Sequence, residues 1–84
     1  MTVTIYSKPG CHLCDELKAM IERVLALNPG AFGVEVRNIL DDPRDFAAYQ
    51  FAIPVILIDG VEIGRYRLSE ADFLAALRTP RIVR

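Results

Sequence analysis

The sequence predicts an α/β fold in which a small mixed sheet carries helices on both faces. Strand-like and helix-like segments follow one another in the order β-α-β-α-β-β-α, judged from whether apolar residues recur every second or every three to four positions. A helix separates the first two strands, which is the connection that parallel strands need. Only Asp59-Gly60, a pair typical of an antiparallel hairpin, separates the last two. We therefore expect a four-stranded mixed sheet.

The first half of the chain predicts a strand, a long helix and a second strand. Residues Thr2–Tyr6 alternate polar and apolar side chains, and the letters "SKPG" end this strand. A helix follows over about Cys11–Leu27, and "NPG" stops it. Its apolar stripe consists of Leu13, Leu17, Met20, Ile21, Val24 and Leu27. The second strand is expected over Val34–Ile39.

The second half predicts a short helix, a hairpin and a final helix. Asp42 is a suitable N-cap and Pro43 a suitable first helical residue. The letters "IPVILIDG" indicate a buried strand led by a proline, and Val61–Gly64 is its return strand. The last helix ends at Pro80. Its capping box and inner face are expected from Ser69, Asp72, Phe73, Leu74 and Leu77.

The composition is that of one folded domain. The chain has 84 residues, of which 52% are hydrophobic and 25% charged, so we expect a single domain over 1–84 with 79–84 as a loose tail. The net charge is −1 without a basic run, which argues against nucleic acid or an anionic membrane as partner. No apolar run approaches the roughly 18 residues of a membrane span, and no signal peptide is visible, so a cytoplasmic location is expected.

Both cysteines lie in one Cys-x-x-Cys motif, Cys11 to Cys14, between a strand and a helix. An anionic sulfur at a helix N-terminus is stabilised by unpaired amide groups and the helix dipole. A free cysteine of pKa about 8.5 is only about 3% ionised at pH 7, whereas in such motifs the pKa falls to roughly 3.5–7.5. Residues three apart share one helix face. We therefore predict that Cys11, at the helix tip, attacks a disulfide and that Cys14, one turn in, resolves it.

Other interpretations of the two cysteines remain open. They are also compatible with two buried structural thiols. A closed zinc site needs four ligands, and the chain offers two thiols and one imidazole. A zinc ion or an iron–sulfur cluster shared between two chains would need ligands from both. No metal ligand is therefore assigned.

Charged neighbours modify the expected chemistry of Cys11. Lys8 would stabilise the thiolate or a bound carboxylate, with a solvated loop lysine as the alternative. His12, a candidate substrate-binding residue, would add positive charge near Cys11, with an exposed spacer that tunes the reduction potential weakly as the alternative. Asp15 and Glu16 suit the helix start but disfavour a nearby thiolate, so we expect a moderate pKa for Cys11.

The segments "YSKPGCHLC" and "FAIPVILIDG", with the amphipathic helix between them, resemble a glutaredoxin-like protein of the thioredoxin-fold superfamily over roughly residues 2–77. The resemblance implies a thioredoxin-like fold and a cis peptide bond between Ile53 and Pro54. It also implies that Pro54 packs opposite the cysteines and that the Ile53 backbone pairs with an extended substrate. The alternative is a proline that only begins an edge strand.

The resemblance is incomplete where such proteins bind glutathione. They usually carry a Gly-Gly pair after the last hairpin; Gly64 matches the first glycine and Arg65 replaces the second. Lys8 matches a lysine that the family places near the glutathione carboxylate. Arg65 or Arg67 is a candidate substitute charge, with a solvated hairpin edge as the alternative. Glutathione is therefore a candidate reductant rather than an assigned ligand.

The leading hypothesis is a monomeric cytoplasmic thiol-disulfide oxidoreductase that carries electrons through a redox disulfide between Cys11 and Cys14. Its expected partners are a disulfide-containing protein or a glutathione mixed disulfide, and a reductase or glutathione as electron donor. No tightly bound cofactor is expected. The alternatives are the shared metal or cluster module and a non-catalytic thioredoxin-fold binding module that uses Ile53 and Pro54.

Overall fold

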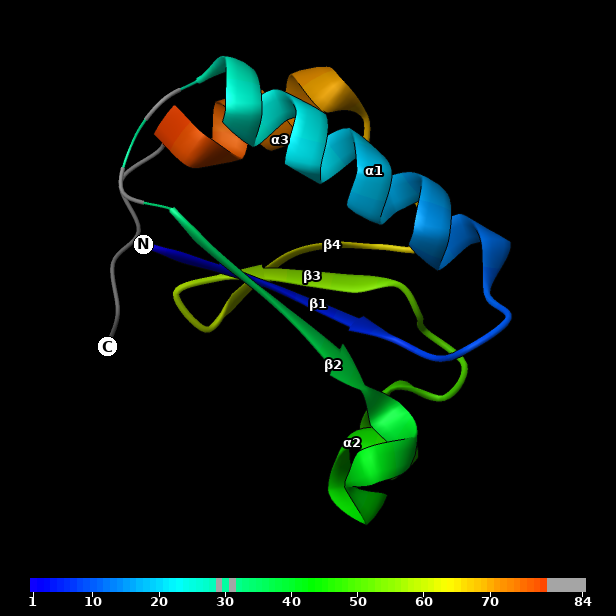
Figure 1. Ribbon diagram of the computed structural model, residues 1–84. Coiled ribbons are helices and arrows are strands. Elements are labelled where there is room, and N and C mark those ends of the chain that lie inside the picture. The colour runs from blue at the N-terminus through cyan, green and yellow to red at the C-terminus, as the bar shows by residue number, and fades with distance from the viewer. Residues whose placement is uncertain (29, 31, 79–84) are drawn as a thin grey trace.

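The computed structural model describes residues 1–28, 30 and 32–78, and a four-stranded sheet lies at its centre (Figure 1). The strands are β1 (Thr2–Ser7), β2 (Gly33–Asn38), β3 (Val55–Ile58) and β4 (Val61–Arg65). They lie in the order β2-β1-β3-β4. Strands β1 and β2 are parallel, and the other two pairs are antiparallel. The predicted mixed sheet is therefore confirmed.

Two helices cover one face of the sheet, and a third lies beyond the other face at one end. Helices α1 (His12–Leu27) and α3 (Glu70–Arg78) lie together above the strands in Figure 1. Helix α2 (Pro43–Tyr49) lies below them, where β2 ends, after a short 3₁₀ helix, Ile39–Asp41. None of the α2 residues is buried. It covers little of the second face, where the ring of Tyr49 stacks 4.4 Å from that of Tyr6.

The core lies between the sheet and the pair α1–α3. Phe73 of α3 is fully buried there. The rest of the cluster comprises Val3, Ile5, Leu17, Ile21, Val24, Ile56 and Ile58. Burial of each such side chain stabilises the fold by about 1.5–3 kcal/mol. The predicted stripe of α1 is wrong at both ends, where Leu13 is 38% and Leu27 72% exposed. At about 100° per residue, Leu27 is rotated by roughly 80° from Leu17.

Side-chain caps define where the helices begin. Cys11 is the N-cap of α1, so the helix starts one residue later than predicted. Asp42 caps α2 as predicted, since its carboxylate accepts the backbone N–H of Arg44 at 2.8 Å. Ser69 Oγ accepts the N–H of Asp72 at 3.0 Å at the start of α3. The second strand ends at Asn38, one residue before the predicted end, because Ile39 already belongs to the 3₁₀ helix.

The hairpin turn between β3 and β4 is the predicted Asp-Gly pair. Asp59 has φ +49° and Gly60 has φ +82°, as a tight hairpin turn of this kind requires. The predicted helix end at Pro80 and the tail 79–84 lie outside the described residues. Among those that are described, no helix is long and apolar enough to cross a membrane.

Candidate redox site

The two cysteines form a disulfide at the N-terminus of α1, Cys11–Cys14, with a Cα–Cα distance of 5.2 Å. The local sequence explains the position: β1 ends at Ser7, Gly10 takes a φ of +80°, and Cys11 has the extended φ of −91° that an N-cap adopts. The two sulfurs therefore meet across the first turn of the helix. This is the pairing that the sequence predicted.

The two sulfurs differ in access and in hydrogen bonding. Cys14 is 2% exposed, whereas Cys11 is partly exposed. The sulfur of Cys11 accepts the backbone N–H of Cys14 at 3.2 Å. An amide directed at this sulfur, together with the positive end of the helix dipole, favours a negative charge on Cys11. The two cysteines thus have different environments. The environment of Cys11 suits an attacking thiol, and that of Cys14 suits a resolving thiol.

The Ile53–Pro54 peptide bond lies at the same end of the sheet as the disulfide and is cis. Val55, which follows it, pairs with Tyr6 near the end of β1, and β1 leads directly to the loop that carries Cys11. Pro54 is buried, and Ile53 is partly exposed. The topology therefore brings these two parts of the predicted site to one edge.

The segment after β4, whose Gly64, Arg65 and Arg67 the sequence singled out, joins this edge through a turn at Tyr66 that the sequence did not predict. The N–H of Tyr66 donates to the carbonyl of Pro54 at 2.8 Å. Tyr66 itself has φ +65°, and the N–H of Arg67 donates to the carbonyl of Arg65 at 2.7 Å around it. This is a tight three-residue turn in a conformation that non-glycine residues rarely adopt. Nothing in the letters "GRYRL" signals such a turn, because they contain no turn residue after the glycine.

Two open grooves flank the start of α1. One, of about 270 Å³, lies between α1 and the segment after β4, and Leu13, Met20, Tyr66 and Arg67 are among its lining residues. The other, of about 280 Å³, lies between α1 and β2 and reaches from Lys8 to the buried Cys14. A substrate at the disulfide thus has polar and apolar side chains on both sides.

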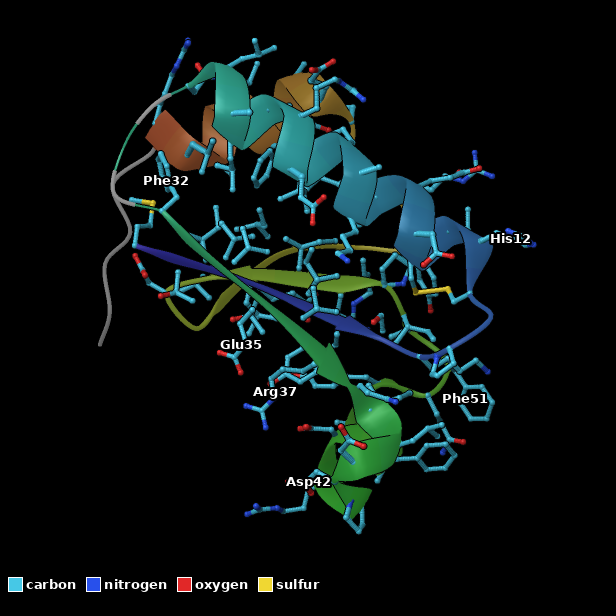
Figure 2. The ribbon with its side chains drawn as sticks, viewed as in Figure 1. His12, Phe32, Glu35, Arg37, Asp42 and Phe51 are labelled. Atoms are coloured by element: carbon cyan, nitrogen blue, oxygen red, sulfur yellow. A yellow bond between two sulfur atoms is a disulfide. The ribbon has the colours of Figure 1, made fainter. Side chains whose placement is uncertain are left out.

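The charged candidates of the sequence lie in different places. Lys8 is exposed in the groove beside Cys14 and forms no ion pair with any described residue. His12 is the first residue of α1, and Figure 2 shows its ring directed outward, away from the disulfide. The structure therefore places Lys8 beside the redox pair and His12 at its exposed rim.

Gly64 and Arg65, the candidates for glutathione binding, are both engaged within the protein. A Cβ at position 64 would lie 3.1 Å from Leu68, so the glycine permits close packing of the next segment. The guanidinium of Arg65 donates to both carboxylate oxygens of Glu62, at 2.7 and 2.9 Å. These hydrogen bonds raise the pKa of Arg65 and lower the pKa of Glu62. Arg67, in contrast, pairs with no carboxylate among the described residues and lines the groove.

Phe51 is an exposed aromatic residue near this edge that the sequence analysis missed. It is 84% exposed in the turn between α2 and Ile53, and Figure 2 shows it projecting outward on the side of the molecule that carries His12. Leu13, inside the Cys-x-x-Cys motif, is 38% exposed. The sequence offered one sign that Phe51 lies near the site, namely its position two residues before Ile53.

Comparisons with known proteins agree on the type of fold. Residues 2–78 match the family described as glutaredoxin-like domain (DUF836). A protein named thioredoxin from Methanocaldococcus jannaschii is 30% identical over 59 residues, which are 69% of each chain. The solution structure of Ne2328 from Nitrosomonas europaea is 26% identical with a TM-score of 0.73, covering 89% of this chain and 88% of that one. Reduced Escherichia coli glutaredoxin, 24% identical with a TM-score of 0.63, shares the fold over 93% and 94% of the two chains.

Proposed function

We propose a function for this chain, which belongs to the glutaredoxin-like domain family. It is a small dithiol thiol-disulfide oxidoreductase. Its thioredoxin- and glutaredoxin-like fold, with a disulfide between Cys11 and Cys14, supports a redox-type function. The observation that carries the finer proposal is the unequal environment of the two sulfurs. One is accessible and accepts an amide N–H, and the other is buried.

The first step begins from the reduced dithiol. The thiolate of Cys11 attacks one sulfur of a substrate disulfide, a bond forms between them, and the substrate's S–S bond breaks. The other substrate sulfur leaves as a thiolate and takes a proton from water. The amide of Cys14 and the start of α1 stabilise the attacking thiolate.

The second step releases the product. Cys14 loses its proton and attacks the sulfur of Cys11, which breaks the mixed disulfide and expels the second substrate thiol. Two electrons have then passed from the protein to the substrate, and the protein is left with the Cys11–Cys14 disulfide. Because Cys14 is 2% exposed, substrates reach it only through Cys11. A donor of two electrons, glutathione or a reductase, restores the dithiol.

Cysteine variants test this order of events. Cys11→Ser should abolish the reduction of a protein disulfide such as that of insulin. Cys14→Ser should form a mixed disulfide with the substrate at Cys11, detectable by mass spectrometry and released by dithiothreitol. Equal reduction rates for wild type and Cys11→Ser would refute the proposal, and trapping at Cys14 in a Cys11→Ser variant would reverse the assigned roles.

The choice of electron donor is open to the same kind of test. Lys8 supports glutathione, because it is a cation beside the redox pair that forms no ion pair with any of residues 1–28, 30 and 32–78. Arg65 gives less support, because Glu62 already holds its guanidinium. We propose glutathione as the donor and expect Lys8→Ala to raise the KM for a glutathione mixed disulfide while a protein disulfide is reduced at the wild-type rate. Faster recycling by thioredoxin reductase than by glutathione would contradict this assignment.

The described side chains of a single chain do not form a metal site of their own. Within residues 1–28, 30 and 32–78, no three His, Cys, Asp or Glu side chains come together in a group suited to a metal ion. Cys11 and Cys14 are joined to each other. The dithiol reaction is therefore the function that the geometry supports best.

A further inference from the structure

Strand β2 has one free edge that is regular over its whole length. All six of its residues pair in register with β1, and β2 is the outermost strand on that side of the sheet. The N–H of Gly33 donates to the carbonyl of Met1 at 2.8 Å, so the odd-numbered residues of β2 direct their backbone groups toward β1. Backbone directions alternate along a strand. The N–H and C=O groups of Val34 and Val36 and the N–H of Asn38 therefore point outward, whereas the C=O of Asn38 belongs to the 3₁₀ helix that Asn38 caps.

The side chains of this strand protect the edge little, because its two charged residues, Glu35 and Arg37, have opposite signs and lie 3.7 Å apart as an ion pair. Val34 and Val36 are 41% and 45% exposed, and β2 contains no proline, lysine or bulge. The opposite edge, β4, is interrupted instead by a register shift opposite Ile56 and Leu57. Protected edges usually show one of these devices. The contrast singles out β2 as the edge able to accept another strand.

We propose that β2 pairs with β2 of a second copy of this chain, antiparallel and about a two-fold axis at Val36. The axis stands perpendicular to the sheet and joins the two sheets into one, with both α1 helices on the same face. Val36 then lies opposite the partner's Val36, and Val34 lies opposite the partner's Asn38. Val36 and the partner's Val36 then exchange two backbone hydrogen bonds, and the N–H of Asn38 donates to the carbonyl of the partner's Val34.

Charge complementarity selects the second copy as the occupant and sets this register. Within one chain Arg37 lies 3.5 Å from Asp45, but the side chains of Arg37 and Glu35 stay 44% and 54% exposed and so remain open to a partner's charges. Centring on Val36 places Glu35 opposite the partner's Arg37 and Arg37 opposite the partner's Glu35. Both side chains lie on the face turned away from α1 (Figure 2), and opposed opposite charges stabilise a strand pair. Moving the axis by one residue, to Glu35, would place the Glu35 side chains of the two copies opposite each other. That register is therefore disfavoured, because like charges directly opposite are destabilising.

The neighbouring structure leaves room for this arrangement. The turn that follows Asn38 would lie beside the partner's Gly33. This residue has no side chain, and even a Cβ at this position would come no nearer than 4.0 Å to Thr2 Oγ1. Helix α2 lies below the sheet past the end of β2 (Figure 1). The net charge of −1 gives two copies little mutual repulsion. A pair of six-residue strands is a small interface, so the dimer is weak and concentration-dependent, in contrast to the monomer expected from sequence.

Mixing two charge variants tests the register directly. Glu35→Lys leaves two positive charges on the strand, and Arg37→Glu leaves two negative ones, so each variant alone opposes like charges. In sedimentation equilibrium at low salt, each variant alone should dimerise at least tenfold more weakly than wild type. An equimolar mixture should form a heterodimer at least as tight as the wild-type dimer, because every opposed pair is then of opposite sign.

Matched controls lie on the exposed surface of α1. Glu22→Lys and Arg23→Glu make the same changes in charge away from β2, and each should dimerise like wild type. Circular dichroism checks that every variant is folded. Three outcomes would overturn the proposal: wild type that stays monomeric to about 1 mM, a dimer that Glu35→Lys leaves unchanged, or a mixture no tighter than its separate components.

Discussion

The reactivity of Cys11 should depend measurably on Asp15, one turn along the same helix. The change to make is Asp15→Asn in a Cys14→Ser background, which leaves Cys11 as the free thiol. Asp15 donates its backbone N–H to the carbonyl of Cys11 at 3.1 Å, and side chains on a helix tilt toward its N-terminus. Its carboxylate therefore repels a thiolate at Cys11, and its removal should lower the pKa of Cys11.

The expected size of the effect follows from the helix geometry. Four residues correspond to about 6 Å along the axis, so we take the Asp15 carboxylate and the Cys11 thiolate to be about 7 Å apart. Because Asp15 is exposed, the dielectric constant of water applies, and the repulsion is about 0.6 kcal/mol. That corresponds to a fall of about 0.4 in the pKa of Cys11 at low salt. Screening at 0.15 M salt should reduce it to about 0.2.

The assay is the rate of alkylation by iodoacetamide as a function of pH. At pH values below the pKa, Asp15→Asn should react up to about twice as fast as its parent at low salt. Glu22→Gln removes the same charge from the same helix, seven residues further on, and should leave the pKa of Cys11 unchanged. An unchanged or higher pKa in Asp15→Asn, or an equal fall in Glu22→Gln, would refute the reasoning. A parent pKa below about 4 would refute the expected moderate acidity.

Three further predictions concern stability. Phe73→Ala should lower the free energy of unfolding by about 3–5 kcal/mol, measured in urea, whereas Phe51→Ala, at a position 84% exposed, should change it by less than about 0.5 kcal/mol. Tyr66→Gly should be more stable than Tyr66→Ala by about 1 kcal/mol, because φ is +65° there; equal stabilities would contradict the described turn. The Arg44 hydrogen bonds lower the pKa of Asp42, so its stabilising contribution is present above the unfolded pKa of about 3.9 and lost as pH falls through the lower folded pKa. Urea titrations should therefore show a smaller loss of stability below about pH 4 in Asp42→Asn than in wild type.

The parts of the site that the sequence predicted depend on local backbone rules. A strand, a break and an acidic first turn are enough to place Cys11 at a helix N-terminus. Asp42 and Ser69 act as caps because their side chains reach amides two or three residues ahead. Such contacts lie within a few residues of chain, and pattern analysis recovers them. The cis peptide bond before Pro54 was expected only from the resemblance to glutaredoxin-like proteins, since most X–Pro bonds are trans.

The interactions that the sequence missed depend on register and tertiary contact. Glu62 and Arg65 are three residues apart and would lie on opposite faces of a regular strand. The register shift in β4 pairs Glu62 with Leu57 and Arg65 with Val55, which brings both onto one face. Only then does Glu62 bind the guanidinium that seemed free for a substrate. The strained turn at Tyr66 likewise depends on its hydrogen bond to Pro54, twelve residues earlier.

The site thus consists of backbone hydrogen bonds, which do not depend on the sequence, and of side chains, which do. Backbone groups hold the reacting parts in place: the amide of Cys14 donates to the sulfur of Cys11, and the N–H of Tyr66 donates to the carbonyl of Pro54. Such groups are present whatever the side chains, so these contacts tolerate changes of sequence. Solved structures less than 30% identical to this chain share its fold. The surrounding side chains, such as Lys8 and Arg67, differ in charge and shape from one sequence to another. Substitution of Lys8 or Arg67 should therefore change which disulfide is preferred, whereas substitution of Cys11 should abolish the proposed reaction itself.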